Sequence, residues 1–224
     1  MRIALFGGTF DPIHVGHLQA AEAAAGRFRL DQVLFVPTGN PPHKRRARLT
    51  SFPHRFAMVA LACAADDRFL PTTLEAPKPD ERPHYSIATV QRVKRFLRPR
   101  DKLFFLMGAD SFLDLPHWKS YRRLLDLVDI IVVSRPGFQP DDIPTVLPRD
   151  LLSTRANRRH PDRVLLRHTT LSILRGVDAP MASRDIRQAI RKGRSVAGLV
   201  PPLVEQYILK AGLYRAPEAR DLER

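Results

Sequence analysis

The sequence predicts an α/β protein with a Rossmann-like, doubly wound, mostly parallel sheet, helices on both faces and a small helical segment near the C-terminal end. Short apolar runs alternate along the chain with segments of helical periodicity, which is typical of strand–helix–strand units. The apolar runs are uninterrupted, as in strands that are buried on both faces of a sheet. Such sheets bind ligands beyond the carboxyl ends of their strands, so the polar motifs after these runs are the candidates for function.

The strands are expected at short apolar runs that end in turn residues. Residues 3–6 form the first, which stops at Gly7 and Gly8, and residues 33–36 form the second, which stops at Pro37. Further extended runs are expected at residues 69–74, 103–107, 130–133 and 164–166.

The helices are expected where alanine-rich or apolar positions recur at helical spacing. Residues 18–25 are alanine-rich and should end at Gly26, since glycine is common just beyond a helix. Pro53 precedes a helix over residues 54–65, because proline is favoured in the first turn. The remaining expectations are helices over residues 86–97, 184–192 and 202–210, and a surface excursion over the Pro-, Asp- and Arg-rich residues 140–161.

The composition bounds the domain organisation and the compartment. The chain has 224 residues and is 44% hydrophobic, which is enough for one large α/β domain. We predict a single domain over residues 1–215 and a C-terminal tail over residues 216–224. The only cysteine, Cys63, lies in an apolar stretch and is expected in the core, so no internal disulfide can form. No signal peptide or membrane-spanning run is found, and a cytoplasmic protein is expected.

The charge is strongly basic. Lysine and arginine exceed aspartate and glutamate by 14, which raises the question of a nucleic-acid partner. The basic clusters lack the interleaved aromatic residues on which RNA-binding proteins stack bases. A basic surface that attracts small anions is therefore the favoured interpretation, and neither a nucleic-acid nor a membrane partner is expected. The sequence leaves open whether the protein is a monomer or a homodimer.

The most informative motif is LFGGTFDPIHVGH, from Leu5 to His17, which links the first strand to the first helix. Gly7 and Gly8 lack a Cβ and allow a phosphate to approach the backbone. The start of the following helix offers N–H groups and the positive end of its dipole. His14 and His17 stand at this point, where each imidazole can donate a hydrogen bond to a phosphate oxygen.

Other interpretations of this stretch are weaker. The spacing of its glycines does not match the G-x-G-x-x-G fingerprint of dinucleotide-binding folds. The two histidines are spaced like a metal-binding pair, but no cysteine or carboxylate cluster completes the set, and no protein-bound metal is expected. The sequence shows no serine–histidine–aspartate or cysteine–histidine arrangement of the kind used in covalent catalysis.

The same stretch resembles the signature of the nucleotidyltransferase superfamily that carries an H-x-G-H motif. Within it, the chain resembles the bacterial nicotinate-nucleotide adenylyltransferases, because further family-like blocks recur over most of its length. These blocks are VP and NPPHK within residues 36–44, RPHYS at 82–86, GADS at 108–111, HWK at 117–119, SRPG at 134–137, DIR at 185–187 and GLVPP at 198–202.

The resemblance implies that ATP transfers its adenylyl group to nicotinate mononucleotide, in a late step of NAD biosynthesis. The products would be nicotinate adenine dinucleotide and pyrophosphate, and the cofactor would be Mg²⁺ carried by the ATP phosphates. The attacking phosphate is already anionic, so catalysis would consist of positioning and charge stabilisation. The residues implied in catalysis are His14, His17, Lys44 and Arg187. The implied ATP ligands are Gly7, Gly8, Thr9, Phe10, His14, His17, Gly108, Asp110, Ser183 and Arg187.

The implied ligands of nicotinate mononucleotide come from several blocks. They are Asn40, His43, Lys44, Ser86, Asp110, Trp118 and Arg135. Trp118 would stack on the pyridine ring, and core packing is the alternative. Ser86 would cap a helix whose N-terminus favours the acid over the amide of the ring substituent. Asp110 would bind a ribose hydroxyl, cap the next helix, or do both. Lys44 would neutralise charge between the substrates, or else be a solvated lysine of a basic loop.

One block departs from the family pattern. Where the family usually shows Ile-Ser-Ser-Thr-x-Ile-Arg, this chain reads MASRDIR over residues 181–187, with Arg184 in the position of the threonine. Ser183 is expected as a helix N-cap and Arg187 as a ligand of the triphosphate.

Two other functions stay open on the sequence. A sibling enzyme could use the same chemistry on another acceptor, as phosphopantetheine adenylyltransferases and cytidylyltransferases do, although the NPPHK and HWK blocks argue against it. An RNA-binding protein or a fragment of a tRNA synthetase is the second, but the chain has no Lys-Met-Ser-Lys-Ser-type loop.

Overall fold

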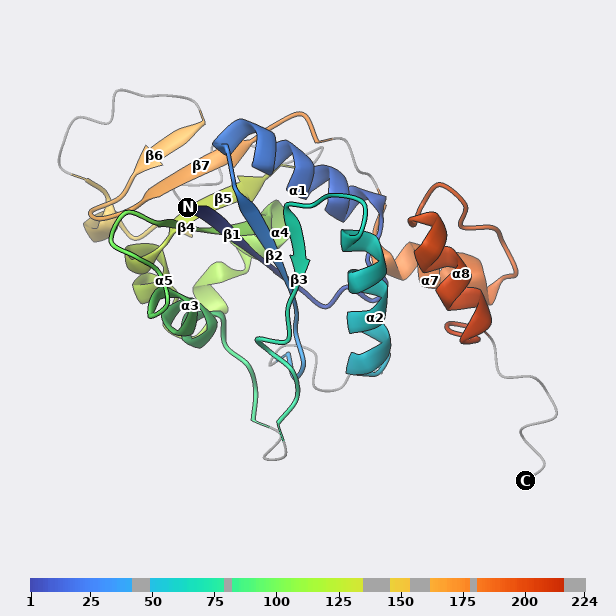
Figure 1. Ribbon diagram of the computed structural model, residues 1–224. Coiled ribbons are helices and arrows are strands. Elements are labelled where there is room, and N and C mark those ends of the chain that lie inside the picture. The colour runs from blue at the N-terminus through green and yellow to red at the C-terminus, as the bar shows by residue number, and fades with distance from the viewer. Residues whose placement is uncertain (42–48, 79–81, 135–145, 154–161, 178–180, 216–224) are drawn as a thin grey trace.

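The computed structural model describes residues 1–41, 49–78, 82–134, 146–153, 162–177 and 181–215. Over these residues the strands form a seven-stranded sheet in the order β3-β2-β1-β4-β5-β7-β6 (Figure 1). Neighbouring strands are parallel except for β6, which is antiparallel to β7. The mostly parallel, doubly wound α/β fold is therefore confirmed. The strands are β1 (Arg2–Gly8), β2 (Gln32–Pro37), β3 (Phe69–Pro71), β4 (Lys102–Gly108), β5 (Asp129–Val133), β6 (Arg163–Leu165) and β7 (Thr170–Leu174).

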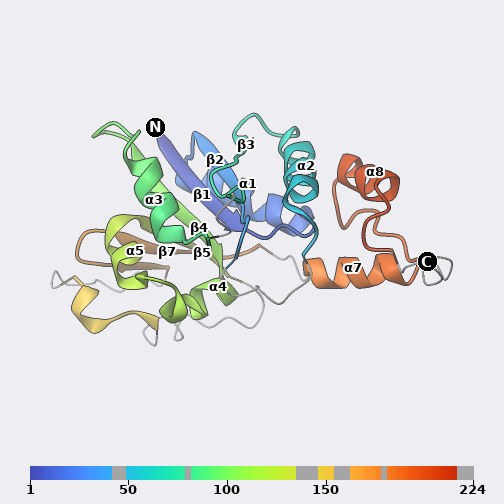
Figure 2. The same cartoon turned by 90° about the horizontal axis from the view of Figure 1, so that it is seen from below.

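Helices cover both faces of this sheet (Figure 2). Buried residues of α1 (Val15–Phe28) and α2 (Phe52–Cys63) belong to the hydrophobic cluster on one face. Those of α3 (Ser86–Lys94) and α5 (Tyr121–Leu127) belong to the cluster on the other. The remaining elements are α4 (Ala109–Leu113), α7 (Ser183–Arg191), α8 (Pro202–Lys210) and the 3-10 turns η2 (Leu115–His117) and η4 (Arg149–Leu151).

The uninterrupted apolar runs divide their side chains between these two clusters. In β1, Ile3 and Leu5 enter the cluster under α3 and α5, whereas Ala4 and Phe6 enter the cluster under α1 and α2. The two-residue period of a strand requires this alternation, so both faces need apolar residues. Cys63 is buried in the second of these clusters, as expected, and burial raises the pKa of its thiol to about 12.

The first helix extends beyond its predicted end. Gly26 was expected to stop it, but α1 continues to Phe28, and Arg29 takes the left-handed cap conformation with φ 48°. Gly26 is an exposed, helical residue of α1, where glycine only lowers the helix propensity. Beyond this position Phe28 packs against the hydrophobic cluster under α1 and α2, which favours continuation of the helix.

Other departures concern short elements. The sequence reasoning missed β7 and α5 and gave no bounds for α4, the helix expected at Asp110. It extended β3 and α3 by three residues each beyond Pro71 and Lys94. The predicted surface excursion over residues 140–161 is wrong for its described part, because Val146, Leu147 and Leu151 are buried in the core. Its other residues and the predicted tail at 216–224 lie outside the described residues.

The last two helices pack beside α2, at the end of the molecule drawn in orange and red in Figure 1. Ile186 of α7 and Val204 and Ile208 of α8 are buried in the same hydrophobic cluster as α1 and α2. This C-terminal segment, defined here as residues 181–215, therefore shares a core with the face of the sheet that α1 and α2 cover. Among the described residues no helix is long and apolar enough to cross a membrane.

Candidate active site

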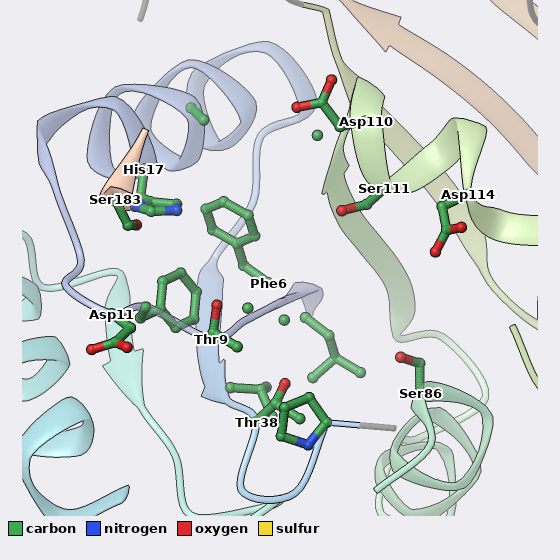
Figure 3. Close-up of a pocket in the computed structure, with 18 of the residues that line it drawn as sticks. Phe6, Thr9, Asp11, His17, Thr38, Ser86, Asp110, Ser111, Asp114 and Ser183 are labelled. Atoms are coloured by element: carbon green, nitrogen blue, oxygen red, sulfur yellow. The ribbon is translucent and has the colours of Figure 1, made fainter. Parts of the chain in front are cut away.

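A cavity of about 760 Å³ opens at the carboxyl ends of the strands, beside β1 and β4 (Figure 3). The strand order reverses between these two strands, which is where doubly wound sheets bind their ligands. The cavity collects most of the site residues that the sequence indicated. These are Gly7, Gly8, Thr9, Phe10, His14, His17, Ser86, Gly108, Asp110, Trp118, Ser183 and Arg187.

The turn from β1 into α1 fixes the geometry of the two histidines. His14 is the N-cap of α1, is 2% exposed, and its ring lies 3.7 Å from the ring of His17, centroid to centroid. The backbone N–H of His14 donates a hydrogen bond of 3.2 Å to His17 Nδ1. Nδ1 is thus an acceptor, and the proton of the neutral His17 ring resides on Nε2. His17 consequently offers an N–H donor, which is what a phosphate oxygen requires.

Two aromatic side chains contact the imidazole of His17. The ring of Phe10 meets His17 edge to face at 5.0 Å, and Phe6 lies 6.0 Å from the same ring. Phe10 is 1% exposed and has a positive φ of 48°, which non-glycine residues rarely adopt. The loop therefore accepts an unfavourable backbone conformation in order to place an aromatic support under His17.

The glycines of the cavity have two different reasons to be glycine. A Cβ on Gly8 would stand 3.0 Å from the Phe10 ring, so a side chain there would crowd the packing within the loop. A Cβ on Gly108 would meet nothing within 4 Å. Gly108 thus keeps open space at the end of β4, which is what the approach of a ligand to the backbone needs.

Helix α7 contributes polar groups to the cavity; the predicted N-cap at Ser183 is wrong, and the predicted role of Arg187 stays a prediction. Ser183 is the first residue of α7 rather than its N-cap, which is Ala182, and its hydroxyl donates to the Pro12 carbonyl at 2.9 Å. Arg187 Nη1 donates to the Asp11 carbonyl at 2.5 Å. Both side chains line the cavity and at the same time hold the backbone of the loop between β1 and α1.

The opposite wall is built by α3, α4 and the segment after α4. Ser86 is the first residue of α3 and Tyr85 is the cap, so the predicted capping role of Ser86 is wrong. Asp110 lies in the first turn of α4, which Gly108 caps, so Asp110 is not the cap either. Figure 3 shows Ser86, Asp110 and Ser111 across the cavity from His17.

Of the two roles that the sequence left open for Trp118, core packing is confirmed, and stacking on the pyridine ring stays a prediction. Trp118 is half-buried, packs against the core with its ring 6.2 Å from that of Phe105, and also lines the cavity. Its indole N–H donates to Asp114 Oδ2 at 3.3 Å. Nearby, the Lys119 ammonium lies 4.4 Å from the centre of the Tyr85 ring. One side of the indole is thereby fixed, and part of it is presented to the cavity.

Comparison with known proteins identifies the family. The family model described as cytidylyltransferase-like matches residues 5–189. A protein of Geotalea daltonii named probable nicotinate-nucleotide adenylyltransferase is 39% identical over 216 residues, which cover 96% of this chain and 98% of that one. Its namesake from Thermus thermophilus is 38% identical over 96% of this chain and 100% of its own length. The chain belongs to the nicotinate-nucleotide adenylyltransferase family.

The fold of the family is found among solved structures as well. The nicotinic acid mononucleotide adenylyltransferase of Plasmodium falciparum, complexed with NaAD, matches with a TM-score of 0.70. The match covers 95% of this chain and 97% of that one at 17% identity. At this identity the likeness concerns the fold, and it agrees with the sheet order and the helical C-terminal segment.

The structure adds cavity residues that the sequence reasoning on this family did not single out. Glu75 lines the cavity, is 6% exposed and accepts a hydrogen bond of 2.6 Å from the Thr89 hydroxyl. Burial raises the pKa of the Glu75 carboxyl above its ordinary value. The further lining residues in this group are Asp11, Thr38, His84, Ser111 and Asp114. Asp11, His84 and Ser111 stand within the family-like blocks of the sequence, whereas no motif marks Glu75 or Asp114.

Some expected ligands lie elsewhere. His43, Lys44 and Arg135 lie outside the described residues, so their predicted roles stay predictions. Asn40 is not among the described residues that line the cavity. It is joined to the wall by backbone contacts, since the His84 N–H donates to the Asn40 carbonyl at 3.1 Å.

The protein donors of the described part do not form a metal cage. No group of three or more histidine, cysteine, aspartate or glutamate side chains is placed there to hold a metal ion. Asp110 and Asp114 line the cavity, but they are not part of such a group. This donor set fits a divalent cation that is held mainly by phosphate oxygens of a substrate.

Proposed function

We propose that this enzyme transfers the adenylyl group of ATP to nicotinate mononucleotide, which yields nicotinate adenine dinucleotide and pyrophosphate. The observation that carries the proposal is the cavity at the strand-order reversal, with the histidine turn on one wall and Trp118 with the start of α3 on the other. Two walls of different chemistry suit two nucleotides held side by side. The family to which the chain belongs supports the choice of substrates.

The wall formed by the β1–α1 turn binds the triphosphate of ATP in this proposal. The Nε2–H group of His17 and the imidazole of His14 donate to phosphate oxygens, and the dipole of α1 favours their negative charge. The Val15 N–H already donates to the Leu199 carbonyl at 3.0 Å, so this first amide of α1 serves the fold rather than the ligand. The imidazoles therefore carry more of the recognition than a bare helix terminus would.

The reaction needs little covalent chemistry from the protein. A phosphate oxygen of the mononucleotide forms a bond to the α-phosphorus of ATP, and the bond from that phosphorus to the bridging oxygen of the β-phosphate breaks. The electron pair leaves with pyrophosphate, and no proton has to be removed from the nucleophile. What the residues supply is alignment and donors for the charge that develops on the transferring group.

The wall formed by Trp118 and α3 receives the pyridine ring in this proposal. The exposed part of the indole stacks on the flat ring, and its other edge is fixed by Asp114 and Phe105. Ser86 begins α3, whose N-terminus favours an anionic substituent, so a carboxylate is preferred to an amide. Lys44, His43, Asn40 and Arg135 remain proposed contacts of this substrate.

We place Mg²⁺ on the phosphates of ATP, where it would supply positive charge that neutralises the triphosphate. Asp110 lies at the end of β4, close enough to the cavity to bind a ribose hydroxyl of either substrate. The reaction is proposed to take place in the cytoplasm, where the buried Cys63 thiol stays reduced.

An acceptor panel tests the proposal. Pyrophosphate release is measured with ATP and Mg²⁺ in the presence of nicotinate mononucleotide, nicotinamide mononucleotide or phosphopantetheine. The nicotinate compound is expected to give the highest kcat/KM. The Trp118→Ala variant is expected to raise its KM while the KM for ATP stays unchanged, and Trp118→Phe to restore part of the affinity. Turnover of phosphopantetheine without turnover of either pyridine nucleotide would refute the proposal and favour a sibling enzyme.

A further inference from the structure

A buried polar cluster holds the loop between β1 and α1 on the side that faces α2. Asp11 and Arg55 are 2% and 1% exposed, and they lie in the middle of this cluster. Arg55, from α2, donates through Nη1 to the Thr9 carbonyl at 2.7 Å and through Nε to the Thr50 carbonyl at 2.9 Å. Figure 3 shows the Asp11 carboxylate turned away from the cavity, toward helix α2. Arg55 does not line the cavity, so it supports the loop from behind, whereas Asp11 belongs both to the cluster and to the cavity lining.

The C-terminal segment completes this cluster. The Tyr214 hydroxyl donates to Asp11 Oδ1 at 2.7 Å, although the two residues are 203 positions apart in the sequence. The other carboxylate oxygen of Asp11 accepts the Thr50 N–H at 3.3 Å. Burial raises the pKa of the Tyr214 phenol, and the Asp11 charge raises it further, so the hydroxyl stays protonated as a donor. Tyr214 also has a positive φ of 64°, a strained conformation for a residue with a side chain.

The same segment fixes the loop at its backbone. The carbonyls of Asp11 and Pro12 accept hydrogen bonds from Arg187 and Ser183 of α7. Thr9, Asp11 and Pro12 form the connection between Gly8 and His14, so their placement sets where the imidazoles of the loop stand. A residue that orients the Asp11 side chain therefore acts on the phosphate-binding wall from a distance.

We infer that Tyr214 is a positioning residue for the ATP wall, which acts through the Asp11 carboxylate to hold the loop that presents His14 and His17. The inference rests on the proposed function for its kinetic readout only. In this interpretation the C-terminal segment is part of the support of the ATP wall, because its docking reaches the loop through the Asp11 carboxylate as well as through the Asp11 and Pro12 carbonyls. The inference predicts that loss of the Tyr214 hydroxyl weakens the binding of ATP and leaves the binding of the pyridine nucleotide unchanged.

The chain offers a matched control. Tyr207 of α8 is also half-buried, and its hydroxyl makes a hydrogen bond of 2.8 Å to His54 Nδ1 of α2. Tyr207→Phe and Tyr214→Phe thus each remove a phenol hydrogen bond between the C-terminal segment and the rest of the protein. Only the second bond ends on the loop between β1 and α1.

The experiment compares both variants with the wild type in steady-state kinetics and in binding of a non-hydrolysable ATP analogue. Tyr214→Phe is expected to lower kcat/KM for ATP and analogue affinity by about tenfold, the effect of losing a hydrogen bond to a charged group. The KM for nicotinate mononucleotide should change less than about twofold, and Tyr207→Phe should leave both substrates unaffected at a similar loss of thermal stability. Equal kinetic effects of the two variants would overturn the inference.

A double-mutant cycle tests the route through Asp11. Asp11→Asn keeps the size of the side chain and removes its charge. If Tyr214 acts through this carboxylate, Tyr214→Phe has a smaller effect on analogue binding in the Asp11→Asn background than in the wild type. Full additivity would overturn the route. The ATP analogue binds in the absence of an acceptor substrate. The cycle can therefore be interpreted even if nicotinate mononucleotide proves not to be the acceptor.

Discussion

His17 is the residue whose side chain is most directly prepared for its proposed role. Its Nδ1 accepts the backbone N–H of His14, and aromatic rings support its plane. We predict that His17→Ala lowers kcat by at least roughly a hundredfold, the scale seen when one donor to a transition state is lost. The exposed His168, on the far edge of the sheet beside β7, is the control, and His168→Ala should leave kcat unchanged. A His17→Ala enzyme with near-normal kcat would contradict the role.

Glu75 gives a prediction about pH. Burial raises the pKa of its carboxyl, so the folded state binds the proton more tightly than the unfolded state does. Its contribution to stability is therefore greatest below the ordinary value of 4.5 and is lost as the pH rises through the raised pKa. Each unit of elevation corresponds to about 1.4 kcal/mol. Glu75→Gln, which keeps an acceptor for Thr89, should remove this pH dependence.

Urea unfolding of both proteins at several pH values between about 4 and 8 measures the effect. The variant is expected to gain stability relative to the wild type as the pH rises. A difference between the two proteins that does not vary with pH would contradict the assignment of a destabilised, buried carboxylate.

Substitution by alanine should change the free energy of unfolding in opposite directions at Gly26 and Gly39. Gly26 lies on the exposed side of α1, and a Cβ there meets nothing within 4 Å, so Gly26→Ala should raise the free energy of unfolding by about 0.5–1 kcal/mol. A Cβ on Gly39, beyond β2, would stand 2.2 Å from the Glu75 carbonyl. Gly39→Ala should therefore lower stability and disturb the wall that Glu75 and Thr89 form. Chemical denaturation measures the free energy of unfolding of both variants. A change of the same sign in the two variants would contradict the prediction.

The elements that the sequence predicted are those with a long or uniform pattern. The helix over residues 202–210 was predicted at both ends, because Pro202 and Gly212 lie at its two ends. By contrast, α4 and α5 span five and seven residues, too few for a helical period to be recognised. Strand β7 reads TLSIL, in which polar residues interrupt the apolar run that marks the other buried strands. The caps of α3, α4 and α7 were misplaced by one or two residues, because the residues at the actual caps, Tyr85, Gly108 and Ala182, make no side-chain cap hydrogen bond and a nearby serine or aspartate was chosen instead.

The site was predictable to the extent that it is local in sequence. The turn from Gly7 to His17 carries its chemistry in consecutive residues, and most of the predicted ligands do line one cavity. The support of that turn is not local, since Arg55 and Tyr214 reach it from distant parts of the chain. Neither residue stands in a motif, and only the fold brings them to Asp11. Sequence reasoning thus finds the groups that face a ligand more readily than the groups that hold them.

The charge of the whole molecule, more than the lining of the cavity, is expected to attract the substrates. The net charge is +14, whereas the cavity lining holds charges of both signs. Within the part of the chain that the structure describes, those charged residues are Asp11, Glu75, Asp110, Asp114, Lys119, Arg184 and Arg187. A field that arises from dispersed surface charges is screened over about 10 Å at 0.1 M salt, while contacts inside a cavity are screened less.

Raising the KCl concentration from about 50 to about 300 mM at constant free Mg²⁺ should therefore lower kcat/KM for ATP by several-fold. The value of kcat, which reflects the bound substrates, should change by less than about twofold under the same conditions. Steady-state kinetics across the salt series, with Na₂SO₄ at matched ionic strength as a check on specific anion competition, measures both quantities. A kcat/KM that does not vary with salt would mean that the cavity alone recruits its anionic substrates, and that the surplus of arginine serves another purpose.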